Sequence, residues 1–212
     1  MKPLAIVFTL GAALSLSACS SILPRGDAYS IYQLPATTAA TATAPAVDWQ
    51  LRVDAPQAAT LLSGTRIVVQ PKPGLVSLYH GARWAQRAPQ LLRDRLINAF
   101  HANGRIHGIS SDDDALQSDY ELDSTLQAFQ SEYQGGAAPV IVLQLDARLL
   151  HAGGNRILAA HRFNVSEASA GTDISQVVAA FGRAGDKLSA VVVDWTLKQG
   201  QLLSKATATD GP

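Results

Sequence analysis

The chain has a single cysteine among its 212 residues, so an internal disulfide cannot stabilise its fold. It also lacks an excess of either charge, with 17 Lys+Arg against 17 Asp+Glu. A nucleic-acid partner is therefore not expected, because such binding needs a clustered basic surplus. Charged residues make up only 16% and hydrophobic residues 47%. This balance is typical of one domain with a substantial core, and disorder throughout the chain is excluded.

Long apolar runs are also scarce. An uncharged apolar run at residues 4–17 follows Met1-Lys2-Pro3 and is shorter than the roughly 20 residues that span a bilayer, and no apolar run of 18 or more residues occurs later. A basic start, a short apolar run and small residues at its end predict a secretory signal peptide over residues 1–18. An N-terminal membrane anchor helix is the alternative. The rest of the chain is expected to be exported and water-soluble.

The cysteine lies directly after this run, in Leu16-Ser17-Ala18-Cys19. These residues resemble the bacterial lipoprotein signal. The resemblance implies that diacylglycerol is attached to Cys19 through a thioether and that residues 1–18 are then removed. A catalytic thiol is the alternative, but no histidine lies near Cys19 in the sequence. We therefore expect a lipid anchor at Cys19 and no cofactor other than this covalent lipid. Stable membrane anchoring takes two or more acyl chains.

The residue after Cys19 is Ser20 and not aspartate, which by the same resemblance implies the outer membrane, on its periplasmic face. Residues 19–27 form a short tether of roughly 30 Å at full extension. A single domain is predicted over 28–198, with an Ala/Thr-rich flexible insertion at 36–46 and a flexible tail at 199–212.

Alternating apolar residues predict strands along most of this domain. His161 lies on the same side of its predicted strand as the apolar residues Ile157 and Phe163. This position predicts that His161 is buried in the core and hydrogen-bonded. In 120–128 the even positions, Ala128 included, are predicted to face inward, and in 140–150 the odd positions. The predicted strand segments are 28–34, 47–54, a hairpin over 65–79 with its turn at 71–74, 120–128, and a second hairpin that joins 140–150 to 156–166.

Helical periodicity predicts two amphipathic helices. The first covers 89–103, with Pro89 in its first turn, Gly104 after its end, and Arg93 pointing away from the apolar face. The second begins after Asp173 and carries an apolar stripe that includes Val191. The predicted class is α+β, a two-layer sandwich of a mostly antiparallel or mixed sheet with two long helices packed on one face.

Catalytic and metal signatures are missing from the sequence. The five histidines lack metal-site spacing, and Asp112-Asp113-Asp114 lacks the Gly and terminal Glu of a calcium loop, which favours a solvated turn. Nucleophile-elbow, phosphate-loop and dinucleotide motifs do not occur. We therefore expect no metal, no catalytic residue and no enzyme, although a triad built from distant residues is left open.

One cluster, Tyr79-His80-Gly81-Ala82-Arg83-Trp84, lies between the first hairpin and the first helix. In one interpretation Trp84 fixes the start of the helix to the sheet, since buried aromatics dominate core energetics. In the other, Tyr79, Arg83 and Trp84 form a surface patch that binds a partner.

Three segments carry a resemblance to a known family: residues 65–104 with Arg83-Trp84-Ala85, residues 29–35 and residues 178–181. In these segments the chain resembles the ABC-type transport auxiliary lipoproteins, the PqiC-like group. The resemblance implies partners: an MCE-domain substrate-binding protein with an ABC permease and ATPase, or an integral membrane protein. It implies transport of lipids or other apolar compounds across the envelope, without catalytic residues in this chain. A homo-oligomer is left open. A lipoprotein cofactor of another envelope machine, such as peptidoglycan synthesis, and a periplasmic hydrolase are the alternatives.

Overall fold

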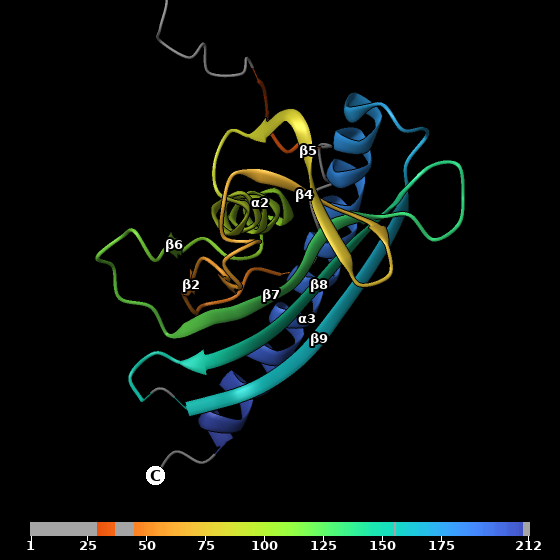
Figure 1. Cartoon of the computed structure of the whole chain (residues 1–212). Helices are drawn as coiled ribbons and strands as arrows, with labels where there is room; N and C mark the ends of the chain where they lie inside the picture. The colour runs from red at the N-terminus through yellow and green to blue at the C-terminus, as the bar shows by residue number, and fades with distance from the viewer. Residues whose placement is uncertain (1–28, 37–44, 155, 210–212) are drawn as a thin grey trace, which may run out of the picture.

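The computed structural model describes residues 29–36, 45–154 and 156–209 (Figure 1). The signal peptide at 1–18, Cys19 and the tether at 19–27 lie outside the described residues. So do residues 37–44 of the predicted insertion.

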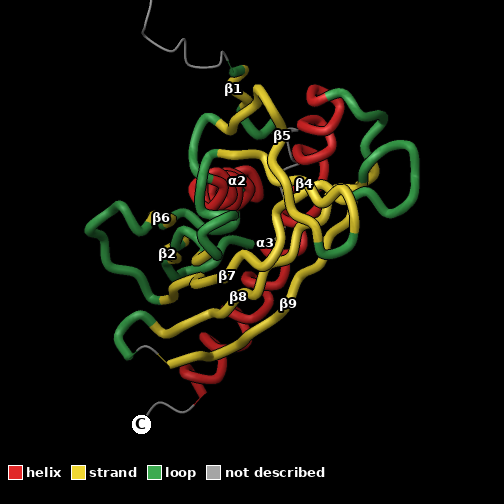
Figure 2. Tube along the Cα trace, viewed as in Figure 1, coloured by secondary structure: helices red, strands yellow, loops and turns green. Residues whose placement is uncertain are grey.

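The domain combines one nine-stranded sheet with two described helices, so the predicted α+β class is confirmed, and the arrangement is consistent with a two-layer sandwich (Figures 1 and 2). The elements in chain order are β1 (Ser30–Tyr32), β2 (Leu51–Val53), β3 (Gln57–Ala58), β4 (Arg66–Lys72), β5 (Leu75–Trp84), α2 (Ala88–Asn103), β6 (Ile109–Ser111), β7 (Tyr120–Glu132), β8 (Val140–His151), β9 (Arg156–Ala168) and α3 (Ile174–Thr209).

Strand β7 organises the sheet. One edge of β7 pairs with β8 along its length in antiparallel register, and β9 continues that hairpin. The other edge is parallel to three strands in turn: β2, then β3, then β4. Beyond β4 lie its antiparallel partner β5 and the parallel strand β1, while β6 lies beside β2. The sheet is therefore mixed, and both predicted hairpins are present.

The alternation predicted for β8 is confirmed, because its odd positions from Ile141 to Leu149 are at most 1% exposed. The prediction for β7 is right only in its first half. A register shift between Leu126 and Ala128 leaves Gln127 without an opposite residue. Such a bulge reverses the faces of the residues that follow it. Phe129, at 1% exposed, therefore takes the inward position that the sequence assigned to Ala128.

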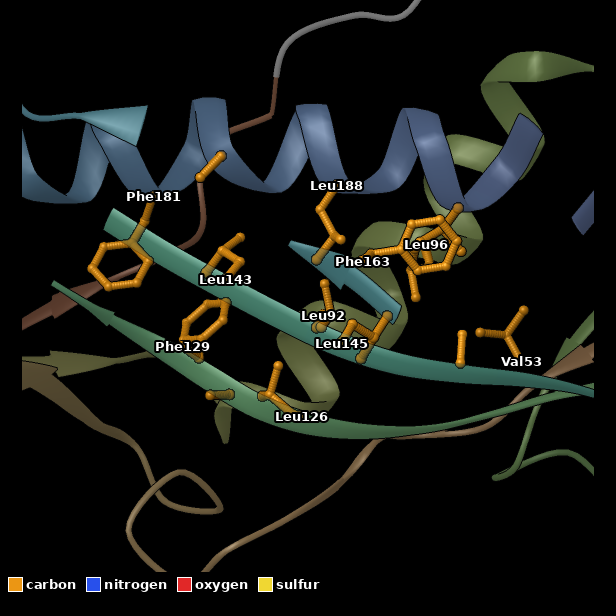
Figure 3. Close-up of a cluster of buried hydrophobic side chains, with 14 of the residues drawn as sticks. Val53, Leu92, Leu96, Leu126, Phe129, Leu143, Leu145, Phe163, Phe181 and Leu188 are labelled. Carbon is orange, nitrogen blue, oxygen red and sulfur yellow. The ribbon is translucent and has the colours of Figure 1, made fainter. Parts of the chain in front are cut away.

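Helix α3 packs along β8 and β9, and Figure 3 shows Phe181 and Leu188 pointing from it toward the sheet. Most of the predicted stripe is buried, but Val191 is 45% exposed, which corrects its assignment. The helix also continues to Thr209, into the segment from residue 199 that the sequence analysis assigned to a flexible tail. Gly200 explains part of this extension, because it lets the helix backbone lie against the buried ring of Trp49.

Helix α2 begins and ends as the sequence predicts. Pro89 lies in the first turn, where a missing N–H leaves no helical hydrogen bond unmade. Gly104 caps the end in a left-handed conformation (φ 77°) and its N–H donates to the carbonyl of Phe100. Arg93 was predicted to point outward but is buried, because the chain near residue 112 covers it.

Two further expectations are wrong in detail. The predicted strand over 47–54 is regular only at Leu51–Val53, although Trp49 on the same row is buried. His161 is exposed and not in the core, and its ring lies 4.6 Å from that of Phe163. A register shift between Leu149 and Leu150 moves the start of β9 by one residue and leaves Ile157 56% exposed, whereas His161 lies beyond the shift and opposes the buried Ala147.

Candidate functional site

The cluster over residues 79–84 is strand and not a connecting loop, because β5 continues through Trp84. Trp84 is 2% exposed and packs edge-on against Phe129 and Phe181, with ring centroids 5.8 and 5.1 Å away. The surface patch of Tyr79, Arg83 and Trp84 is therefore corrected, because Trp84 belongs to the core. Of the three, Tyr79 and Arg83 are partly exposed.

A bulge in β5 opens a hollow beside these two residues. Val68 pairs with Leu78, and Arg66 pairs with Arg83. Between these two pairs β5 therefore contains more residues than β4. Gly81 takes up the extra chain length with φ 67°, a left-handed conformation that other residues rarely adopt. The resulting hollow has a volume of about 330 Å³, and its lining comprises Tyr29, Arg66 and residues 78–83.

The hollow is lined by cationic and aromatic side chains. Arg66 and Arg83 are direct register partners across β4 and β5. The Arg83 guanidinium lies over the ring of Tyr29, 4.2 Å from its centroid, in a cation–π contact. Neither arginine pairs with a carboxylate in the parts of the chain that the structure describes. This region of the sheet therefore carries uncompensated positive charge.

Tyr79 contributes to the hollow from a fixed position. Its hydroxyl lies 3.0 Å from the hydroxyl of Ser131, which is fully buried on β7. Burial raises the pKa of the Tyr79 phenol above its ordinary value. Tyr79 therefore stays neutral at physiological pH and acts as a hydrogen-bonding, apolar wall.

The chain enters the fold beside the hollow, through Tyr29 and β1. The carbonyl of Tyr32 accepts a hydrogen bond from the N–H of Ala85 at 2.7 Å. Pro35 lies three residues after Tyr32, and its carbonyl accepts a hydrogen bond from Arg95 of α2. The Arg95 guanidinium also donates to the carbonyl of Gly182 in α3, at 2.9 Å. The N-terminal segment is thus tied to both helices.

A glycine inside a helix normally weakens it, as the sequence pattern of α3 predicts for Gly182 and Gly185, but the structure gives Gly182 a packing role. A Cβ at Gly182 would lie 2.8 Å from the carbonyl oxygen of Pro35, so the segment can dock only against glycine. Burial lowers the pKa of Arg95, and Asp186, 3.0 Å away, opposes that shift. The docking therefore depends on a buried charge that carbonyl groups and one carboxylate surround.

The acidic residues 112–114 form an exposed turn, as the sequence predicted, and this turn is held to α2 by Arg93. Arg93 donates to Asp112 and Asp113, both at 2.7 Å, and pairs with Asp94 at 3.0 Å. Burial alone would lower the pKa of Arg93, but these hydrogen bonds outweigh it and raise that pKa. Asp112 is partly buried too, yet the Arg93 guanidinium lowers its pKa below the usual value. The cluster is structural, because its single guanidinium joins α2 to the turn at 112–114 through three carboxylates.

Two searches of the described residues gave no site. Groups of three or more His, Cys, Asp or Glu side chains that could hold a metal do not occur there. Neither helix of the described part combines the length and apolarity needed to cross a membrane.

The sequence analysis missed Tyr29 and Arg66 as neighbours of Arg83. Tyr29 is far from Arg83 in sequence and meets it only through the parallel pairing of β1 with β5. Arg66 opposes Arg83 only because the hairpin bulges. A signal was available in Gly81, since a glycine inside a strand pattern often marks a bulge.

Comparison with known proteins agrees with this fold. A crystal structure from Xanthomonas campestris, assigned to the domain family DUF330, superposes with a TM-score of 0.77 at 36% identity, over 83% of this chain and 99% of that chain. An uncharacterized protein of known structure shares the fold at 20% identity and a TM-score of 0.60, over 80% of this chain and 99% of its own.

A curated protein of Bradyrhizobium diazoefficiens, described as uncharacterized, is 25% identical over 150 residues. The match covers 69% of this chain but only 39% of that relative, so the chain spans well under half of its length. Residues 32–193 match the family described as ABC-type transport auxiliary lipoprotein component, which is a family of transport components and not of enzymes. The chain belongs to this family of ABC-type transport auxiliary lipoproteins.

Proposed function

We propose that this chain is an outer-membrane lipoprotein that faces the periplasm, and that it serves a transport system of the ABC/MCE type. The observation that carries the proposal is the family match over residues 32–193. The lipid on Cys19 anchors the domain, and the system moves lipids or other apolar compounds across the envelope. The partners are an MCE-domain substrate-binding protein and an ABC permease with its ATPase, or an integral membrane protein.

The contacts of the N-terminal segment support a mechanical role for the anchor. The carbonyls of Tyr32 and Pro35 are held by Ala85 and Arg95, close to where the chain leaves the tether. A pull from Cys19 is therefore transmitted to α2 and α3 through hydrogen bonds to buried groups. The anchor therefore holds the entry side of the domain near the leaflet, which suits a component that receives or positions a partner.

We assign no catalysis to this chain. Its charged side chains in the core region are held in structural pairs, such as Arg95 with Asp186 and Arg93 with Asp112. Energy for transport comes from the ATPase partner. This chain contributes anchoring and a docking surface.

The test is a cross-linking experiment in cells that produce the protein with a C-terminal tag. After mild cross-linking and membrane solubilisation, mass spectrometry identifies the proteins recovered with it. Recovery of an MCE-domain protein and a permease is the expected result. Recovery of a peptidoglycan synthase, or of no transport component in several detergents, would overturn the proposal and favour the cell-wall alternative.

The matched control is Cys19→Ala, which removes the anchor and leaves every described residue intact. The variant should move from the membrane to the soluble periplasmic fraction and lose most of the recovered permease. Continued membrane attachment would contradict the anchor.

A further inference from the structure

The two arginines of the hollow face each other in a way that costs stability. Arg66 and Arg83 are register partners, and like charges directly opposite across two strands repel. Elsewhere on the sheet, Arg148 pairs with Asp123 at 2.8 Å and Arg162 pairs with Asp146. Among the described residues no carboxylate plays that part for Arg66 or Arg83. This arrangement points to an anion from outside the chain.

The lining suits a phosphate group. Arginine presents a planar fork of donors that matches phosphate oxygens, and it keeps its charge at all physiological pH values. Tyr29 holds the Arg83 fork in place by stacking at 4.2 Å. His80 and Tyr79 line the same hollow. Its volume of about 330 Å³ lies at the small end of the range of ligand sites, about 300–1,000 Å³.

The position of the hollow favours a membrane source for that phosphate. Tyr29, part of its wall, comes ten residues after Cys19 in the sequence, a separation of at most about 35 Å when extended. An exposed apolar side chain lies beside the arginines, because Ile31 on β1, 65% exposed, is the register partner of Arg83. Cationic groups beside exposed apolar ones match the boundary between headgroups and acyl chains.

We propose that the hollow between β1, β4 and β5 binds the phosphate of a phospholipid headgroup, with Arg66 and Arg83 as its donors. This inference rests on the proposed function in one respect, because the anchor at Cys19 brings the hollow to a leaflet. It goes further by giving the domain a lipid contact of its own. That contact orients the sheet against the membrane.

The test is vesicle co-sedimentation of the mature chain, residues 19–212, as Cys19→Ala. Its core residues all lie between Tyr32 and Leu203, so this form keeps the whole folded unit and lacks only the lipid. One set of vesicles contains phosphatidylglycerol in a digalactosyldiacylglycerol background, and the other contains the glycolipid alone. Each basic residue near an anionic surface contributes about a fivefold gain in binding, so Arg66→Gln with Arg83→Gln should weaken it about thirtyfold.

The matched control removes two charges at the other end of the molecule, with Arg156→Gln and Lys198→Gln. Both residues are exposed, at the start of β9 and in the last part of α3, the end remote from β5 in Figure 1. Circular dichroism of both double variants verifies that each is folded. Loss of binding in the first pair alone, and only with phosphatidylglycerol, supports the proposal.

Three results would overturn it. Equal weakening by both double variants would mean that general charge attraction holds the protein to the vesicles. Binding to the glycolipid alone would exclude a phosphate contact. Thermal stabilisation by inorganic phosphate, abolished by the Arg66 and Arg83 substitutions and without any vesicle binding, would assign the hollow to free phosphate. None of these assays involves a transporter, so their failure is distinct from that of the proposed function.

Discussion

Two regions of the sheet differ in how the charges on neighbouring strands are arranged. The long-strand half consists of β7, β8, β9 and α3, and the hairpin half consists of β1, β4 and β5. In the long-strand half the inner row of β8 is buried, and oppositely charged residues pair across the strands, as Asp123 does with Arg148 and Asp146 with Arg162. Both halves contain two register shifts, but in the hairpin half Arg66 directly opposes Arg83. Cross-strand charge pairs in the first half are opposite in sign, whereas the second half leaves two like charges opposite each other for a ligand.

The largest difference should appear when the same substitution is made in each half. Leu145 on β8 is fully buried, whereas Leu75 at the start of β5 is 50% exposed. Leu145→Ala should lower the free energy of unfolding by about 2–5 kcal/mol through lost burial and a cavity. Leu75→Ala should change it by less than about 0.5 kcal/mol. Urea denaturation followed by circular dichroism measures both.

Similar losses for the two leucines would mean that the hairpin half is as closely packed as the long-strand half. The two halves would then not differ in packing.

A second pair of variants tests the junction between the halves, where the entry segment meets α3. A Cβ at Gly182 would lie 2.8 Å from the Pro35 carbonyl, but one at Gly185 would have its closest neighbours at 3.5 Å. Gly185→Ala should stabilise the protein by about 0.5–1 kcal/mol, because alanine favours helix more than glycine does. Gly182→Ala should lose that gain and cost about 1–3 kcal/mol through overpacking.

Opposite signs in thermal unfolding are therefore the expected outcome. Stabilisation by both alanines would contradict the close docking of residue 35. Limited proteolysis gives a second measurement, since Gly182→Ala should speed cleavage in the entry segment and Gly185→Ala should not.

These glycines illustrate how far the sequence could predict the structure. Its pattern predicted the helix ends at Pro89 and Gly104 and the inner row of β8, because local chemistry and strict alternation decide those features. It could not predict the partner of Gly182, since Pro35 reaches it from far along the chain. A helix pattern alone predicted only that glycine weakens α3.

The errors at Gln127 and Arg93 have the same origin. The alternation of 120–128 contains nothing that marks a bulge at Gln127, so the shift came from pairing with β8. The helical pattern placed Arg93 outside, but Asp112 and Asp113 fold over it. The candidate site was predicted in part: Tyr79 and Arg83 line the hollow, while Arg66 and Tyr29 join them only through strand pairing.

A third prediction concerns the ion pair between Arg93 of α2 and Asp112 in the turn at 112–114. The pKa of Asp112 is lowered in the folded protein, so its ion pair stabilises the fold above the unfolded pKa, about 3.9. This contribution is lost as pH falls through the lower, folded pKa. Asp112→Asn should reduce stability at neutral pH by less than about 1 kcal/mol, because the carboxylate is partly exposed.

The same variant should also lose less stability than the wild type when the pH falls from about 5 to 3. Urea midpoints at several pH values measure the slope. Asp194→Asn is the matched control, because Asp194 is exposed on α3 without an ion-pair partner among the described residues. Identical acid slopes for wild type and Asp112→Asn would contradict the assignment.

The smallest effect is the most informative about the two halves, because it should change sign between them. Arg162 pairs with Asp146 across β8 and β9, so Arg162→Gln should lower stability slightly. Arg66 faces another arginine, so Arg66→Gln should raise stability by about 0.2–0.5 kcal/mol in the absence of ligand. A residue whose removal stabilises the fold is retained for another reason, which is typical of binding sites. Paired thermal melts at low ionic strength measure the difference, and high salt should shrink both effects because these side chains are exposed. If Arg66→Gln destabilised the protein as Arg162→Gln is expected to, Arg66 would have a partner within the chain. The charges of the hairpin half would then be paired as they are across the long strands.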